Sequence, residues 1–193
     1  MLILASTSRY RAELLSRLGL AFETRAPGVD ESSLPGEAPA AMALRLALAK
    51  ARAVAAGLPA GLVIGSDQVA HCAGQVLGKP GNAQTARAQL LHMSGRTTRF
   101  DTALALVDAS AGTEQSVVVS TDVELRTLSG SEIDAYLRID EPWDCAGSAR
   151  SEGLGVVLMK SISGPDPTAL VGLPLIELSA MLRRAGLDPL ARP

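Results

Sequence analysis

The chain has 193 residues, of which 47% are hydrophobic and only 3% aromatic, and its formal net charge is −2. This length suits a single domain over 1–193, with or without two lobes, and the aliphatic residues are sufficient to build its core. Proteins that bind nucleic acid usually have an excess of basic residues, which this chain lacks, so we expect no nucleic-acid partner. Any anionic ligand must be held by local basic groups.

The sequence shows no sign of secretion or of a membrane span. The apolar start at Leu2 is short and follows no basic segment, and no apolar run approaches the roughly 18 residues that a span needs. Cys72 and Cys145 match neither a zinc motif nor a secreted disulfide framework, which favours two thiols in a reducing compartment. We therefore expect a cytoplasmic protein with no membrane partner.

The apolar pattern and the candidate cap residues predict alternating strands and helices, with a hairpin in the middle of the chain. The expected elements are strand 2–5, helix 9–18, strand 21–25, helix 39–56, a strand from 62 into 68, a hairpin through Gly74, helix 82–92, strands 100–107 and 117–125, a helix from Ser129 or Ser131 to 137, strand 155–159 and helix 174–184. This order predicts an α/β fold with a mixed, twisted central sheet flanked by helices.

Asp67 is a polar residue at the expected end of an apolar strand. A buried carboxylate without partners is costly, and the strand ends of α/β sheets are where ligands bind. A turn-forming aspartate would explain the same residue, but we favour a functional site.

Basic residues near helices offer two ways to hold an anion. Ser6 and Ser8 lead into the first predicted helix, which carries Arg11, and the unpaired N–H groups of a helix N-terminus attract anions. Ordinary capping beside a solvated basic turn is equally consistent with these residues. Lys50 rises from the Ala/Leu face of the helix predicted over 39–56, so it either snorkels to the rim or projects into a cleft as a phosphate ligand.

Two loops add weaker candidates. The stretch from Gly78 to Pro80 is not a P-loop, because no Ser or Thr follows Lys79, but it leaves a lysine on a rigid turn. Asp30 and Glu31 are adjacent acids that suit a hard divalent cation, although such a pair is usually only part of a solvated loop.

Taken together and in order, these stretches resemble the Maf family of nucleotide pyrophosphatases over nearly the whole chain. The matching pieces are Leu4–Ser8 with Arg11, Val29–Glu31, Lys50–Ala51, Gly65–Asp67, Gly78–Pro80, Ser94–Gly95, Ala146–Ser148, Glu152–Gly153 and Gly172–Pro174. The match is closer to the branch that resembles 7-methyl-GTP pyrophosphatases, because the dTTP/UTP branch has other residues at Tyr10, Gln68 and Glu152. Arg9 departs from the family pattern, which has proline there, and it adds a positive charge near the expected phosphates.

The resemblance implies a Maf/ITPase-like fold with two lobes around a cleft, and a house-cleaning hydrolase for modified nucleotides. It implies water attack on the α–β phosphoanhydride of 7-methyl-GTP, a nucleoside triphosphate, giving 7-methyl-GMP and pyrophosphate. The implied roles are Asp67 as proton acceptor, Ser8, Arg11, Lys50 and Lys79 as triphosphate ligands, Glu31 and Asp67 as ligands of a divalent metal cation, Mg²⁺ or Mn²⁺, and Tyr10, Gln68 and Glu152 as specificity residues.

Two alternative functions stay open from the sequence. One is the same reaction on dTTP or UTP. The other is a non-catalytic regulator of septum formation, a process to which the family is also linked. The resemblance further leads us to expect a homodimer.

Overall fold

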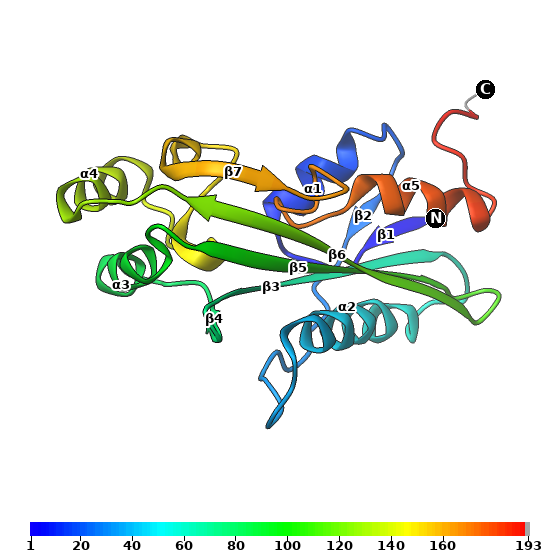
Figure 1. Ribbon diagram of the computed structural model, residues 1–193. Helices are drawn as coiled ribbons and strands as arrows, with labels where there is room; N and C mark the ends of the chain where they lie inside the picture. Colours follow the sequence, from blue (N-terminus) through cyan, green and yellow to red (C-terminus); the bar gives the residue numbers. More distant parts are fainter. Residues whose placement is uncertain (192–193) are drawn as a thin grey trace. The chain divides into compact units, whose positions relative to one another are not determined.

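The computed structural model describes residues 1–191. Figure 1 shows helices packed on the strands of a central sheet. The elements in chain order are β1 (Leu2–Leu4), α1 (Arg9–Ser16), β2 (Glu23–Thr24), α2 (Pro39–Ala55), β3 (Leu62–Cys72), β4 (Gln75–Leu77), α3 (Ala83–Met93), β5 (Thr97–Asp108), β6 (Thr113–Leu125), α4 (Gly130–Asp140), the 3₁₀ helices η1 (Ala146–Ser148) and η2 (Leu154–Leu158), β7 (Met159–Ser163) and α5 (Leu175–Arg184).

The strands form one mixed sheet. Their order is β2-β1-β3-β5-β6-β7, and β4 pairs with β3 away from this path. Strand β1 is parallel to both β2 and β3, whereas β4 is antiparallel to β3 and β7 to β6. The predicted α/β fold with a mixed sheet and flanking helices is therefore confirmed, as is the hairpin through Gly74.

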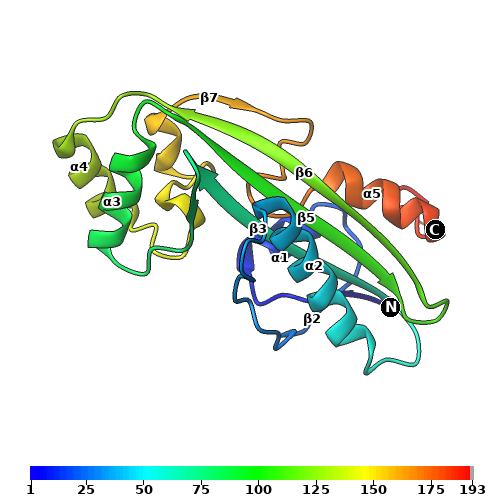
Figure 2. The same ribbon diagram turned by 60° about the horizontal axis from the view of Figure 1, so that its bottom comes forward.

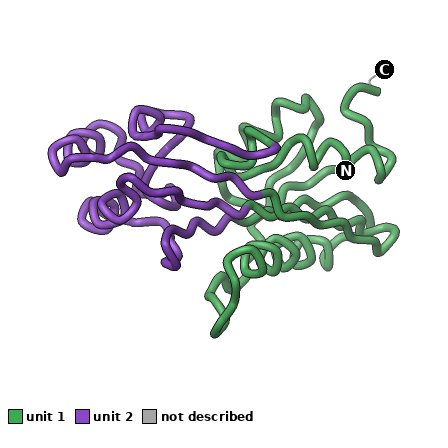
Figure 3. The backbone as a smooth tube through the Cα atoms, in the orientation of Figure 1, with its two compact units in different colours: residues 1–67, 102–119, 166–193 green, residues 68–101, 120–165 purple. Residues whose placement is uncertain are grey.

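The chain divides into two compact units, coloured separately in Figure 3. Unit 1 contains residues 1–67, 102–119 and the described residues from 166 onward, and unit 2 contains 68–101 and 120–165. Strands β3, β5 and β6 contribute residues to both units.

Unit 1 has helices on both faces of its strands. Helices α1 and α5 cover one face, and α2 covers the other, as Figures 1 and 2 show. The core on the α1/α5 side is built mainly of leucines, including Leu4, Leu14, Leu15, Leu104, Leu178 and Leu182 with Ile64. Helix α2 begins at Pro39, whose fixed φ suits the first helical position, and it buries a stripe of small residues.

Unit 2 contains α3 and α4, and side-chain caps define where both helices begin. The Asn82 carboxamide oxygen accepts from Thr85 N at 2.9 Å. Ser129, not Ser131, caps α4, and Glu132 completes a capping box by accepting from Ser129 N at 2.8 Å. The sequence had left open which serine served as the cap, and the glutamate three residues later explains the choice.

One predicted strand is wrong, and one helix is shorter than expected. Residues 154–158 form the 3₁₀ helix η2, and the last strand begins only at Met159. The two valines at 156 and 157 suggested a strand, yet both are about half exposed. Gly155 is buried so closely against the backbone of Arg150 that a side chain would collide with it, which fixes a tight turn instead. Helix α1 ends at Ser16 rather than at residue 18.

The two cysteines, and the helices as regards a membrane span, agree with the sequence-based expectations. Cys72 is buried and Cys145 half-buried, and both are free thiols, as predicted. None of the helices within residues 1–191 is both long enough and apolar enough to cross a membrane.

Candidate active site

Asp67 lies inside a long strand rather than at its end, so the predicted position is corrected. Strand β3 continues to Cys72, but β1 pairs only with its first residues, Leu62 to Ile64. Asp67 therefore lies just past the end of the neighbouring strand. Because side chains alternate along a strand, Ser66 and Asp67 point to opposite faces.

The close approach of α2 to β3 brings a lysine to Asp67. Gly65 makes this approach feasible, because a Cβ there would collide with the backbone oxygen of Ala47 and would lie 2.8 Å from Ala51 N. Lys50 Nζ lies 2.6 Å from Asp67 Oδ1, and the two residues are only 4% and 8% exposed. Lys50 thus does not snorkel to solvent; it forms a buried ion pair.

Glu31 is a second acid at the same lysine. It comes from the segment between β2 and α2, and its Oε1 lies 2.6 Å from Lys50 Nζ while its side chain is 59% exposed. Arg45 on α2 stabilises this segment by donating to both carboxylate oxygens of Glu37 and, at 3.0 Å, to Ser32 O. The predicted metal candidate Glu31 is thus next to the predicted catalytic residue.

Arg11 is oriented by the backbone of a distant segment. Its Nε donates to Gly172 O at 2.9 Å, and Nη1 lies 3.5 Å from the Ser6 hydroxyl oxygen. Ser6 also accepts from Ser8 N at 3.1 Å. Ser8 caps α1 by accepting from Arg11 N at 3.4 Å, so its predicted capping role is confirmed, and its own O–H proton can still be donated.

The electrostatics of this group show that its charges influence one another. Burial lowers the pKa of Arg11 below its ordinary value, and the carboxylates of Asp67 and Glu31 partly offset this effect. Arginine remains protonated in proteins at any ordinary pH. Two cations, Arg11 and Lys50, therefore stand beside two acids, an arrangement that can receive the negative charge of phosphates when a ligand competes for the cations.

The acids fit a divalent cation that shares its coordination with phosphate. Glu31 and Asp67 each place an oxygen 2.6 Å from the same Lys50 nitrogen, so the two carboxylates converge. No group of three or more His, Cys, Asp or Glu side chains suited to a metal occurs within residues 1–191. Mg²⁺ is typically held by one or two carboxylates together with substrate phosphates and water, which matches this pair.

Tyr10 already has a cation on its ring. The Arg9 guanidinium lies 4.7 Å from the ring centroid, and Arg9 Nη2 donates to the Tyr10 hydroxyl at 2.7 Å. The residue that departs from the family pattern therefore stacks on the predicted specificity residue. A cationic base would have to compete with this arginine for the ring face.

Three predicted residues belong to unit 2. Gln68 is half-buried on β3, Lys79 is exposed after β4, and Glu152 is exposed with Ser151 Oγ 3.1 Å from its Oε2. Gln89 Nε2 donates to Gly78 O at 3.0 Å and so fixes the turn before Lys79. The residues that the structure brings together are those of unit 1, namely Arg11, Glu31, Lys50 and Asp67 with Ser8 nearby.

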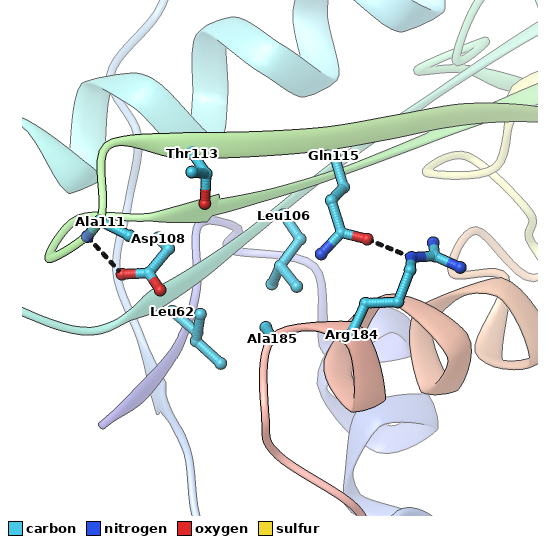
Figure 4. A pocket seen from close by; sticks show the side chains of 8 residues that line it. All are labelled: Leu62, Leu106, Asp108, Ala111, Thr113, Gln115, Arg184 and Ala185. Atoms are coloured by element: carbon cyan, nitrogen blue, oxygen red, sulfur yellow. Dashed lines mark hydrogen bonds between the residues drawn. The ribbon is translucent and has the colours of Figure 1, made fainter.

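A separate cavity of about 260 Å³ lies in unit 1 and contains none of the predicted site residues. Figure 4 shows its lining, which includes Leu62 at the start of β3, Asp108 at the end of β5 and Arg184 at the end of α5. Arg184 Nε donates to Gln115 Oε1 at 2.6 Å. Asp67 is five residues farther along β3, roughly 16 Å at the rise of a strand, so this cavity is not the candidate site.

The sequence identified the charged residues but not the groups that hold them. Ser66 is fully buried, with its hydroxyl 2.8 Å from Ala103 O and 2.9 Å from Gly172 O. Gly172 and Gly65 contribute only backbone, so no side-chain chemistry marks their roles. The only available signals were their positions in the matching stretches.

Comparison with known proteins gives consistent matches over the whole chain. A family model described as "Maf-like protein" matches residues 1–185. A 7-methyl-GTP pyrophosphatase of Bordetella avium is 57% identical over 192 residues, covering 100% of this chain and 96% of the relative. Proteins of the same name from Albidiferax ferrireducens and Thiobacillus denitrificans are 55% and 53% identical and cover 98% and 100% of this chain, and 95% and 96% of their own lengths.

Proposed function

Because the chain belongs to the Maf family, we propose that it is a pyrophosphatase that hydrolyses 7-methyl-GTP to 7-methyl-GMP and pyrophosphate. The observation that carries the proposal is the buried Lys50–Asp67 pair with Glu31 and Arg11 beside it. Relatives that are 53–57% identical to this chain have the name of this activity. The proposal includes a cytoplasmic location, which the two free thiols support.

The proposed reaction needs charge neutralisation and a positioned water more than covalent chemistry. Asp67 accepts a proton from the attacking water, the water oxygen bonds to phosphorus, and the α–β bridge opens to release pyrophosphate. Arg11 and Lys50 hold the triphosphate by neutralising the charge of its oxygens, and Ser8 donates its hydroxyl proton to one of them. The family resemblance also makes Lys79 a candidate triphosphate ligand.

A divalent cation completes the proposed site. Glu31 and Asp67 would hold Mg²⁺ or Mn²⁺, which supplies Lewis-acid stabilisation of phosphate charge when bound. Lys50, which contacts Glu31 here, would be able to contact a phosphate oxygen instead. Chelation with EDTA should abolish pyrophosphate release, and excess Mg²⁺ or Mn²⁺ should restore it; full activity in EDTA would exclude the requirement.

Three residues, Tyr10, Gln68 and Glu152, are proposed to select the 7-methylguanine base. A 7-methylguanine ring is cationic, and it would have to displace Arg9 from the face of the Tyr10 ring to stack there. Glu152 offers a carboxylate for the adjacent N1–H and amino donors of guanine, and Gln68 is a further candidate for contact with the base.

Replacement of the central aspartate tests the proposed chemistry. Asp67→Asn keeps an oxygen that can accept from Lys50 but removes the proton acceptor, so we expect no measurable pyrophosphate release from 7-methyl-GTP. Circular dichroism checks that the variant is folded at the assay temperature. Near-normal release by the folded variant would refute the role of Asp67.

A further inference from the structure

Residues 166–174, which lie between β7 and α5, hold Arg11 through one backbone carbonyl. Gly172 O accepts from Arg11 Nε at 2.9 Å, and the Ser66 hydroxyl lies at 2.9 Å from the same oxygen. A guanidinium is planar, so fixing Nε fixes the direction in which its two terminal nitrogens point. The position of this carbonyl therefore sets the direction of the Arg11 guanidinium.

Gly172 adopts a backbone conformation that favours glycine. Its φ is 114°, and its N–H donates to Ala169 O at 2.9 Å. Ala169 O also accepts from the buried Thr102 hydroxyl of β5 at 2.9 Å. The turn that presents the carbonyl is thus attached to the sheet, and a side chain at 172 would strain it.

Asp166 and Thr168 join the two ends of this segment. Asp166 is 2% exposed; its Oδ1 accepts from Thr168 N at 2.9 Å, and its Oδ2 accepts from Ile176 N, in the first turn of α5, at 2.8 Å. The Thr168 hydroxyl lies 2.6 Å from Asp166 Oδ1 and accepts from Leu175 N at 2.8 Å. A buried carboxylate with three such donors defines one conformation of the segment.

We propose that Asp166 and Thr168 are positioning residues for phosphate binding, because they fix the Gly172 carbonyl that aims Arg11. The inference rests on the proposed function only in taking Arg11 as a ligand of the triphosphate. Neither residue touches the phosphates; both act through the 166–174 backbone.

The matched variants Thr168→Val and Thr168→Ser test this role. Valine has the shape of threonine without the hydroxyl, whereas serine keeps the hydroxyl. We expect Thr168→Val to raise KM for 7-methyl-GTP about tenfold with kcat changed less than about twofold, because uniform binding is lost, and Thr168→Ser to restore the wild-type KM. Equal KM values for the two variants would overturn the inference.

A double-mutant cycle separates positioning from general destabilisation. Arg11→Lys keeps the charge but has no Nε–H for Gly172 O, so Thr168→Val should raise KM less than about twofold further in that background. The same tenfold factor in both backgrounds would overturn the inference. Leu178→Val, which removes buried volume from α5, serves as a destabilised control and should leave KM unchanged.

Binding of inorganic pyrophosphate, measured by calorimetry, keeps the two proposals distinguishable. If the wild-type protein released no pyrophosphate from any triphosphate, the proposed function would fail. Weaker pyrophosphate binding by Thr168→Val than by Thr168→Ser would still support the positioning role, and equal binding would reject it.

Discussion

Lys50 brings its charge into the interior of unit 1, where Asp67 and Glu31 are its partners. The sequence showed a lysine on an apolar helical face, which left a solvated and a functional interpretation open. Its exposure of 4% excludes the solvated one. The partners themselves were not predictable from spacing, because they depend on how closely α2 approaches β3.

Glu152 is the residue on which the proposed guanine preference depends most. Glu152→Gln keeps one acceptor but loses the charge that suits two adjacent N–H donors. We expect kcat/KM for 7-methyl-GTP to fall about tenfold or more, while the low activity on dTTP changes little. Parallel losses on both substrates would show that Glu152 does not read the base.

The contact between α2 and β3 is the element-scale feature on which the site depends. Gly65→Ala should push α2 away from β3, destabilise the protein by about 1–3 kcal/mol through overpacking, and separate Lys50 from Asp67. Both the unfolding midpoint and pyrophosphate release should therefore fall. Gly57→Ala is the matched control, since the nearest atom to its new Cβ is Val54 O at 3.9 Å, and a similar loss in that variant would contradict the account.

The capping box of α4 provides an independent check on unit 2 through pH. The Ser129 backbone N–H, then Arg126 and the Ser129 hydroxyl, lower the pKa of Glu132 from its ordinary 4.5 to about 2. A carboxylate whose pKa is lower in the folded than in the unfolded state stabilises the fold at pH values above its unfolded pKa. This stabilisation is lost as the pH falls from about 4.5 to about 2. The melting temperatures of wild type and Glu132→Gln should therefore differ above pH 4.5 and converge toward pH 2; a constant difference would contradict this.

Local signals explain which elements could be predicted. Asn82 and Pro39 mark helix starts by chemistry within one turn, and the structure confirms both; of the two serines that the sequence offered for α4, the cap is Ser129. The strand expected at 155–159 failed because the valines there suggested pairing, whereas Gly155 packs against the Arg150 backbone, a tertiary contact that composition does not reveal.

At the scale of the molecule, the alternation of strands and helices was sufficient to predict the mixed α/β fold. The backbone contact that orients Arg11 was harder to predict, because Gly172 lies 161 residues from Arg11 in sequence and acts through its carbonyl. The charged side chains of Arg11, Lys50 and Asp67 could be recognised in the sequence as candidate ligands or catalytic groups. A backbone carbonyl cannot be recognised in this way, because every residue has one. The matching stretch Gly172–Pro174 was therefore the only guide to the Gly172 carbonyl.

The most direct test of the central claim is pyrophosphate release from a panel of 7-methyl-GTP, GTP, dTTP and UTP, with Mg²⁺ or Mn²⁺ present. The account predicts stoichiometric pyrophosphate and nucleoside monophosphate, with the highest kcat/KM on 7-methyl-GTP. Release of inorganic phosphate instead, or a higher kcat/KM on dTTP or UTP than on 7-methyl-GTP, would contradict it.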